Sequence, residues 1–125
     1  MAENELSNVV IGACIDIHRQ LGPGLLESAY QKFLAHELTL RGIPFEREVP
    51  ISVTYRGLAV DCRFRLDFWL ERKLIPELKA VDKLLPIHTA QLLTYLKLTG
   101  CKLGLLINFN AKVLKDGIVR VANGL

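Results

Sequence analysis

The segment FRLDFWLERKLIPELK, residues 64–79, decides the fold because it carries a strand pattern on each side of a charged turn. Apolar and aromatic side chains surround Asp67 before the turn, and Glu77 and Lys79 follow it two positions apart. Side chains two apart in a strand project from the same face, so Glu77 and Lys79 share one. A hairpin centred on Arg72 sets Asp67 directly opposite Glu77. The segment therefore predicts a β-hairpin that brings two carboxylates and a lysine together.

Two facing carboxylates repel each other unless a cation lies between them. Asp67 and Glu77 would supply the hard oxygen ligands that Mg²⁺ or Mn²⁺ prefers, and the backbone carbonyl of Leu78 is a further oxygen ligand between them. The same register sets Arg65 opposite Lys79, so a solvated ladder of alternating charges is a competing interpretation. Taken alone, an aspartate followed by Glu-x-Lys favours the charge ladder.

Helical and strand patterns on both sides of this hairpin define the other elements. Apolar residues recur at helical spacing over residues 6–21 and 26–38, and a glycine ends each pattern. β-Branched and aromatic residues alternate over residues 45–78, which predicts an antiparallel meander. The meander is expected to be interrupted at Pro50, at Arg56-Gly57 and at Glu71-Arg72-Lys73.

The remaining third of the chain predicts one more helix and two more strands. Helical spacing returns over residues 87–99, and residues 103–109 and 113–121 have strand patterns. The predicted order is ααβββαββ. With no repeat, linker or low-complexity stretch, this order predicts a single α/β domain over residues 1–125, with helices flanking a central mixed sheet.

Composition narrows the class of protein. The 125 residues are half apolar, which is enough for one core, and the net charge of +3 suits a nucleic-acid partner without requiring one. Cys14, Cys62 and Cys101 include no Cys-x-x-Cys pair, which disfavours zinc ribbons, iron–sulfur clusters and disulfide frameworks. The first residues are acidic rather than signal-like, and no apolar run approaches the roughly 20 residues of a membrane span. We expect a cytoplasmic protein with reduced thiols and no membrane partner.

Polar side chains on two of the predicted helices favour a functional site. Gln91 and Tyr95 are four apart and share a helix face, with His88 one turn earlier. Glu27 lies in the first turn of its helix, where the helix dipole favours a carboxylate. Each has a structural alternative: Glu27 complements the dipole, Tyr95 is a core aromatic with its hydroxyl at the rim, and His88 is an ordinary satisfied histidine. Their joint occurrence makes the functional interpretation the stronger one.

Residues 24–30, GLLESAY, form a Gly-x-x-Glu-x-x-Tyr motif. Asp67, Glu-Leu-Lys at residues 77–79 and Gln-x-x-x-Tyr at residues 91–95 follow in that order. The chain thereby resembles the family called GxxExxY proteins, a branch of the PD-(D/E)XK nuclease superfamily. The resemblance covers residues 7–121, including GLLINF at residues 104–109 and KDGI at residues 115–118.

This resemblance implies a restriction-endonuclease-like core and a divalent-metal-dependent nuclease that uses Mg²⁺ or Mn²⁺ to hydrolyse phosphodiester bonds in DNA or RNA. It implies Asp67 and Glu77 as metal ligands and Lys79 as the group that orients or activates the attacking water. Glu27 would complete the metal shell. The expected catalytic residues are Glu27, Asp67, Glu77, Lys79, Gln91 and Tyr95, the last two positioning Lys79 or the substrate strand.

Two positions depart from the family pattern. Leu66 stands where the superfamily's name has a proline, and Pro76 directly precedes Glu77 in a strand expected to be central. A proline there removes a ladder donor, so the strand has a bulge or an edge position, or else the site is distorted. The alternative function is a non-catalytic nuclease-like module that binds nucleic acid or a protein partner. Because Asp67, Glu77 and Lys79 are all present, the enzyme is favoured.

Apolar residues nearly encircle the first predicted helix. Such a helix needs cover on more than one side, which predicts self-association. A homodimer would place two sites across one nucleic-acid duplex. The residues that carry this prediction are Val9, Val10, Ile11, Ile15 and Ile17.

Overall fold

The computed structural model describes residues 1–125, apart from the side chains of Cys62 and Arg63. Three α-helices and five strands follow the predicted order ααβββαββ, with one short 3₁₀ helix before the last strand. The elements are α1 (Glu3–Leu21), α2 (Glu27–Leu40), β1 (Glu46–Tyr55), β2 (Leu58–Trp69), β3 (Leu74–Lys79), α3 (Pro86–Thr99), β4 (Leu103–Asn108), η1 (Leu114–Gly117) and β5 (Ile118–Ala122).

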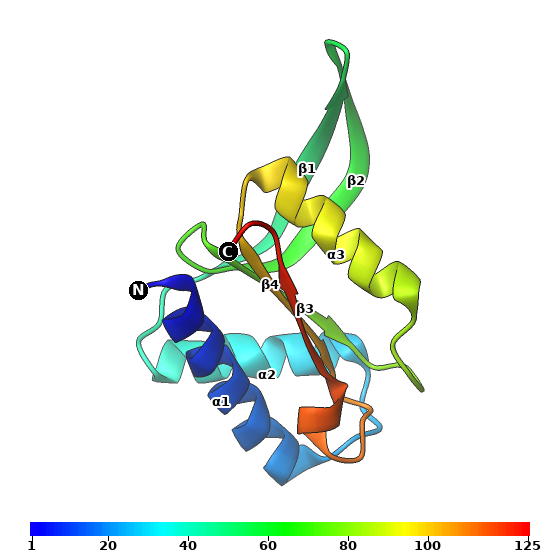
Figure 1. The fold of residues 1–125 in the computed structure, drawn as a ribbon. Coiled ribbons are helices and arrows are strands. Elements are labelled where there is room, and N and C mark those ends of the chain that lie inside the picture. Colours follow the sequence, from blue (N-terminus) through cyan, green and yellow to red (C-terminus); the bar gives the residue numbers. More distant parts are fainter.

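A three-stranded mixed sheet forms the centre of the molecule. Its order is β3-β4-β5, with β3 parallel to β4 and β4 antiparallel to β5. Helices α1 and α2 cover one face, and α3 covers the other (Figure 1). Alternate residues of β3 follow this division, because Leu74 and Leu78 pack toward α1 and α2 while Ile75 packs toward α3. The predicted α/β fold with helices on both sides of a mixed sheet is confirmed.

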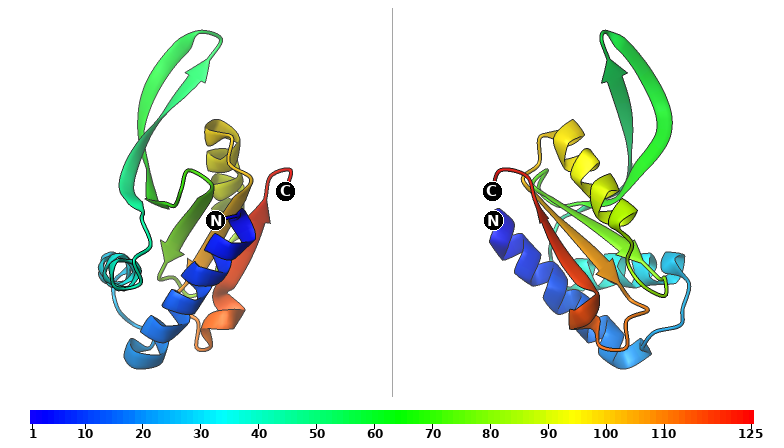
Figure 2. Two further views of the ribbon diagram at one scale, coloured as in Figure 1. Left: turned by 90° about the vertical axis from the view of Figure 1, so that its left-hand side faces the viewer. Right: turned by 45° about the vertical axis from the view of Figure 1, so that its right-hand side comes forward.

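The predicted antiparallel meander over residues 45–78 is wrong at its second turn. β1 and β2 form a separate two-stranded ribbon that extends beyond the body of the molecule (Figures 1 and 2). β2 meets β3 in one isolated bridge, Leu70 with Leu74, and the two strands then separate. The next hydrogen-bonded pair of that ladder would join Phe68 to Pro76, but proline has no N–H to donate. Pro76 is therefore a physical reason for the end of the ladder.

Two predicted strand boundaries also differ. The break expected at Pro50 is wrong: Pro50 lies inside β1, paired with Arg65, because both strands of a two-stranded ribbon are edges that tolerate a missing donor. The strand expected over residues 113–121 begins only at Ile118, after η1. Gly117 lies so close to the preceding loop that a Cβ there would be 2.6 Å from the carbonyl oxygen of Asn108. This close turn takes the place of the first half of the predicted strand.

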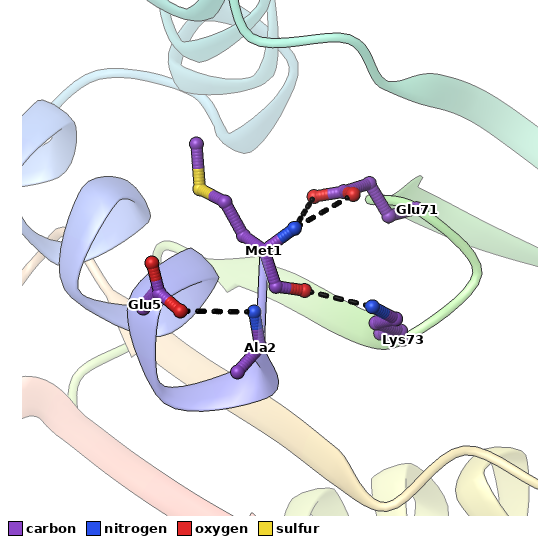
Figure 3. A network of polar contacts seen from close by, with 5 residues as sticks. All are labelled: Met1, Ala2, Glu5, Glu71 and Lys73. Carbon is purple, nitrogen blue, oxygen red and sulfur yellow. Dashed lines mark hydrogen bonds and ion pairs between the residues drawn. The ribbon is translucent and has the colours of Figure 1, made fainter.

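The N-terminus holds the turn between β2 and β3 against α1 (Figure 3). The Met1 ammonium donates to the two carboxylate oxygens of Glu71 at 3.0 and 3.2 Å, and Lys73 Nζ donates to the Met1 carbonyl at 2.8 Å. Glu71 and Arg72 have φ values of 49° and 56°, a backbone conformation that non-glycine residues seldom adopt. The Arg72 guanidinium lies 4.0 Å from the centre of the Trp69 ring. These contacts stabilise the strained turn that sets the register of β2 with β3.

Helix α1 packs its apolar residues against the core of its own chain. Val10 and Ile17 are buried, and Val9, Ile11 and Ile15 are partly buried against the same core. The cover that the sequence predicts for this helix is thus largely supplied within one chain. Self-association stays a prediction.

The cysteines were predicted to be reduced. Cys14 and Cys101 are buried and form no disulfide, and the prediction for Cys62 concerns a side chain outside those that the structure describes. Burial raises the pKa of the Cys14 thiol far above its ordinary value, so this group is an inert part of the core. Within the described residues, no helix combines the length and the apolar character needed to cross a bilayer.

Candidate active site between two separating strands

The site lies in the gap that opens between β2 and β3 beyond the Leu70–Leu74 bridge. The backbone N–H of Asp67 donates to Glu77 Oε1 at 3.2 Å, and the N–H of Leu78 donates to Asp67 Oδ2 at 3.0 Å. Two side-chain carboxylates thus accept backbone donors in the gap where the β2–β3 ladder has ended. These contacts fix both side chains in the gap, and they agree with the predicted register of Asp67 opposite Glu77. We call Asp67 and Glu77 the carboxylate pair.

Pro76 occupies an edge of β3, so the site is not distorted by a lost donor. The Lys79 carbonyl accepts the N–H of Phe109 just beyond β4, at 2.9 Å, whereas the Leu78 N–H faces Asp67 on the opposite edge. Alternate residues of a strand turn their backbone groups to opposite edges, so the nitrogen of Pro76 lies on the β2 side, like that of Leu78. The parallel register of β3 with β4 runs unbroken through Pro76. Of the alternatives raised by the sequence, the edge position is the one observed.

The same geometry places the Leu78 carbonyl near the carboxylate pair. The N–H and the C=O of one strand residue point to the same edge, and the Leu78 N–H points at Asp67. The predicted oxygen ligand Leu78 is therefore turned toward β2, where the carboxylate pair lies.

Glu77 has the most strongly shifted pKa of the site. It is only 6% exposed. Burial raises the pKa of Glu77 well above its ordinary value of 4.5; the negative charge of Asp67 and a side-chain hydrogen bond with it raise it further, while Lys79 opposes the shift. Two adjacent carboxyl groups away from water resist simultaneous ionisation. A cation between them would remove this penalty and favour the doubly charged pair.

Glu27, the first residue of α2, approaches the carboxylate pair from a third element. Burial raises the pKa of Glu27, Lys79 lowers it and Asp67 raises it, so the three side chains lie within electrostatic reach of one another. Glu27 is half-buried at a helix N-terminus, where the helix dipole stabilises its charge. This position is consistent with both interpretations of Glu27, as a residue of the site and as a partner of the helix dipole.

Tyr30 explains how the Gly-x-x-Glu-x-x-Tyr motif positions Glu27. The Tyr30 hydroxyl donates to the Gly22 carbonyl at 2.6 Å and accepts the Leu25 N–H at 3.2 Å. Its ring stacks on Phe109 with centroids 4.3 Å apart. Gly24 in the same turn has a φ of 103°, which favours glycine. Sequence analysis missed this role of Tyr30; a tyrosine one turn into a helix that follows a Gly-Pro-Gly turn was the available signal.

Helix α3 brings Tyr95 near the carboxylate pair. Tyr95 is 6% exposed, and burial raises its pKa, with further contributions from the charges of Glu77 and Asp67. Tyr95 is thus both a core aromatic, as in the structural alternative, and a near neighbour of the carboxylate pair. Gln91 is partly buried and lines a groove with Tyr95.

His88 has the structural role that its alternative reading predicts. Its Nδ1 accepts the backbone N–H of Leu85 at 3.0 Å, which satisfies one backbone group at the start of α3.

The competing charge ladder between β2 and β3 is not formed. Arg65 is exposed and pairs with Pro50 of β1, and β2 makes no ladder with β3 at the height of Lys79. Among the described side chains, no ion pair within 4.0 Å involves Lys79, Asp67 or Glu77. Lys79 shares a strand face with Glu77 and is partly exposed, so its ammonium is available to a ligand.

A family model for the PD-(D/E)XK nuclease superfamily matches residues 4–121. The chain belongs to this superfamily. Searches of curated proteins and of solved structures found no match. Membership together with the observed element order confirms the expected restriction-endonuclease-like fold class. Proteins of the PD-(D/E)XK superfamily generally use divalent metal ions, which makes the oxygen donors of the gap the relevant ones to test.

The donors present in this PD-(D/E)XK domain fit a hard divalent cation. The carboxylate pair and the Leu78 carbonyl are all oxygen ligands, the set that Mg²⁺ and Mn²⁺ accept. Glu77 is a buried carboxyl whose pKa is raised by burial and by the neighbouring charge of Asp67, and a bound cation would counter both effects. In the part of the chain whose side chains are described, no three His, Cys, Asp or Glu side chains gather closely enough to hold a metal. In this arrangement Glu27 thus does not form a three-residue cluster with the carboxylate pair, and its part in metal binding stays a prediction.

Asn108 supports the exit of β3 and was missed by sequence analysis. It lies opposite Lys79 at the end of β4 and is 3% exposed. Its Oδ1 accepts the Val81 N–H at 3.1 Å, and its Nδ2 donates to the Val81 carbonyl at 2.8 Å. The amide thus holds the segment that follows Lys79. An asparagine at the end of an otherwise apolar strand was the available signal.

Proposed function

We propose that this chain is a divalent-metal-dependent nuclease that hydrolyses phosphodiester bonds in DNA or RNA. The observation that carries the proposal is the carboxylate pair, in which Asp67 and Glu77 face each other across a gap and each accepts a backbone N–H. Superfamily membership supports the same reaction class. A purely structural role would not explain why two carboxyl groups, that of Glu77 buried, face each other without an ion pair among the described residues.

The residues that would hold Mg²⁺ or Mn²⁺ are Asp67, Glu77 and the Leu78 carbonyl, with Glu27 reaching the ion directly or through water. When bound, such an ion stabilises charge on the phosphoryl oxygens and makes a bound water more acidic. Asp67 and Glu77 are fixed by backbone donors before any ligand arrives, so little side-chain ordering is needed on binding. This preorganisation is what a catalytic site requires.

Lys79 would act on the attacking water or on the developing negative charge. It shares a strand face with Glu77 and makes no ion pair among the described residues. A free ammonium beside the carboxylate pair can hold a water by hydrogen bonding or offset phosphoryl charge. Gln91 and Tyr95 of α3 would position Lys79 or the substrate strand.

A non-catalytic nuclease-like module that binds nucleic acid or a protein partner is the second candidate. The observation that favours it is the absence of a third metal-ligating side chain beside the carboxylate pair among the described residues. A two-carboxylate site binds a cation more weakly than a three-carboxylate one, because fewer charges offset its dehydration. Cleavage would separate the two candidates.

Three further expectations belong to the same proposal. The Gly-x-x-Glu-x-x-Tyr motif places the chain in the GxxExxY branch of the superfamily. A homodimer would present two sites to one duplex, and we expect the protein to act in the cytoplasm. None of the three is needed for the cleavage reaction itself.

The test is a cleavage assay with Mg²⁺ or Mn²⁺ on labelled DNA and RNA, each single-stranded and double-stranded. Wild type and Glu77→Ala are compared, with Glu37→Ala as a matched control because Glu37 lies in the last turn of α2, at the opposite end from Glu27, and pairs with Arg41. We expect metal-dependent cleavage by wild type and by Glu37→Ala, and none by Glu77→Ala. Equal cleavage by all three would contradict the proposed site.

A further inference from the structure

An apolar groove adjoins the carboxylate pair between α3 and the β1–β2 ribbon, which lie side by side (Figure 1). Its volume is about 470 Å³, within the range of roughly 300–1,000 Å³ typical of small-molecule sites. Phe64 and Val53 line it from the ribbon, and Ile87, Gln91, Tyr95 and Leu98 line it from α3.

The groove is continuous with the proposed cleavage site. Tyr95 lines the groove, lies within electrostatic reach of Glu77 and Asp67, and packs in the same core cluster as Ile75 of β3. Gln91, which lines the groove beside it, is a predicted residue of the cleavage site. Phe64 precedes Asp67 by three residues on β2, so it lies about 10 Å along the strand from the carboxylate pair. A strand whose phosphate is held at the pair would thus place a neighbouring nucleotide at the groove.

The lining of the groove suits a base rather than a phosphate. Among the described side chains that line it, none is Asp, Glu, Lys or Arg. His88 also lines it, but its Nδ1 accepts the Leu85 N–H, so most of the wall that a ligand would meet is apolar or aromatic. Two aromatic rings, those of Phe64 and Tyr95, lie with centroids 5.9 Å apart and tilted by 59°. Phe64 is 39% exposed and Ile87 is 65% exposed, so the apolar wall is open to a ligand. The Gln91 amide adds a polar group that can meet the edge of a base.

We propose that this groove, formed by Phe64, Tyr95, Gln91 and Ile87, binds one unstacked nucleobase of the substrate next to the cleaved phosphate. The inference rests on the proposed nuclease function and specifies its substrate. A base held against aromatic rings is withdrawn from the stack of a duplex. The site is therefore specific for single-stranded or frayed nucleic acid over an intact duplex.

The experiment uses a single-stranded oligonucleotide containing one 2-aminopurine, whose fluorescence is quenched when the base stacks. Binding is measured by anisotropy in Ca²⁺, and cleavage is measured separately in Mg²⁺. The variants are Phe64→Ala and the matched control Tyr55→Ala, because Tyr55 is an aromatic of the same ribbon that is 70% exposed and does not line the groove. Thermal melting checks that each variant is folded.

We expect wild type and Tyr55→Ala to quench the fluorescence and to prefer the single strand over a blunt hairpin duplex. Phe64→Ala should lose the quenching and bind the strand about 5- to 150-fold more weakly, the range measured for loss of one base–aromatic stack. An abasic substitution should weaken wild type and leave Phe64→Ala unchanged.

Three results would overturn the inference. Binding without quenching, or equal affinity for strand and blunt duplex, excludes a base in the groove; if cleavage persists, the proposed nuclease function still stands. A dimer that becomes monomeric in Phe64→Ala, with unchanged nucleic-acid binding, would make the groove an interface between two copies. Neither binding nor cleavage of any nucleic acid would overturn this inference together with the proposed function.

Discussion

The backbone N–H of Leu78 donates a hydrogen bond of 3.0 Å to Oδ2 of Asp67, across the gap between two strands that no longer pair. A side-chain carboxylate here replaces the backbone carbonyl that a regular hairpin would offer. This contact links the fold to the site. Its donor, Leu78, lies between Glu77 and Lys79 on β3, and its acceptor, Asp67, is the carboxylate that faces Glu77 from β2. Four predictions follow from this arrangement and from the contacts around it.

Replacing Asp67 separates its structural role from its chemical one. Asp67→Asn keeps an oxygen that can accept the Leu78 N–H, whereas Asp67→Ala leaves that donor unpaired at a cost of about 1–3 kcal/mol. Both variants should lose metal-dependent cleavage by about 100-fold or more, since a lost ion removes several kcal/mol of transition-state stabilisation. Urea denaturation and cleavage rates measure the two effects. Equal stability of the Asn and Ala variants would argue against the hydrogen bond.

Glu77→Gln should change how stability depends on pH. Because the folded pKa of Glu77 is raised, its neutral form stabilises the fold fully below the ordinary pKa of 4.5, and this contribution is lost as pH rises through the folded pKa. Metal-free Glu77→Gln should therefore melt at a higher temperature than wild type at pH 8 and at about the same temperature at pH 4. Mg²⁺ should raise the melting temperature of wild type at pH 8 only. A constant difference between the variants across this range would count against the cause given for the shift.

Pro76→Ala should be nearly neutral. The Pro76 nitrogen faces the β2 edge, where the ladder has already ended, so an added N–H gains no partner in β4. We expect a stability change within about 1 kcal/mol and unchanged metal binding. Ile75→Pro is the contrasting variant, because the Ile75 nitrogen faces β4, and it should cost about 3 kcal/mol or more. Similar losses for both variants would show that the edge assignment is wrong.

Tyr30→Phe tests the hydroxyl that holds the turn between α1 and α2. Removing it leaves the Gly22 carbonyl and the Leu25 N–H without this partner, while the stack on Phe109 remains. We expect a loss of about 1–3 kcal/mol in the free energy of unfolding. Tyr55→Phe, at an exposed position on the ribbon, should change it by less than about 0.5 kcal/mol. Chemical denaturation of both variants provides the comparison.

The element order was predicted because glycines and charged turns separate the segments of helical spacing from those of strand composition. The prediction was wrong over residues 114–117, which form η1 instead of a strand. The sequence also predicted the facing of Asp67 and Glu77, since the charged turn at Arg72 fixes the register by counting. It did not predict the separation of β2 from β3, because a local pattern does not show where a proline nitrogen points. From the sequence, Pro76 therefore suggested a distorted site as one possibility. Its nitrogen in fact faces the gap, where no ladder hydrogen bond is lost.

Roles that depend on contacts between residues far apart in the chain could not be predicted from local patterns. Tyr30 acts on a carbonyl eight residues earlier and on Phe109, and Asn108 acts on Val81. Neither relation has a periodic signature. Phe64 was visible only as one more aromatic in a strand, and its place beside Tyr95 requires the packing of α3 against the ribbon.

The most direct measurement of the central claim is a calorimetric titration of Mn²⁺ into metal-free wild type, Glu77→Gln and Glu37→Gln at pH 8. Glu37 is the matched control, because its carboxylate pairs with Arg41 in the last turn of α2, outside the hairpin that carries the carboxylate pair. We predict saturable binding to wild type and to Glu37→Gln, and binding to Glu77→Gln weaker by about 100-fold or more, since one of two charged ligands is lost. Equal binding by all three proteins, or no binding by wild type, would contradict a metal site at Asp67 and Glu77.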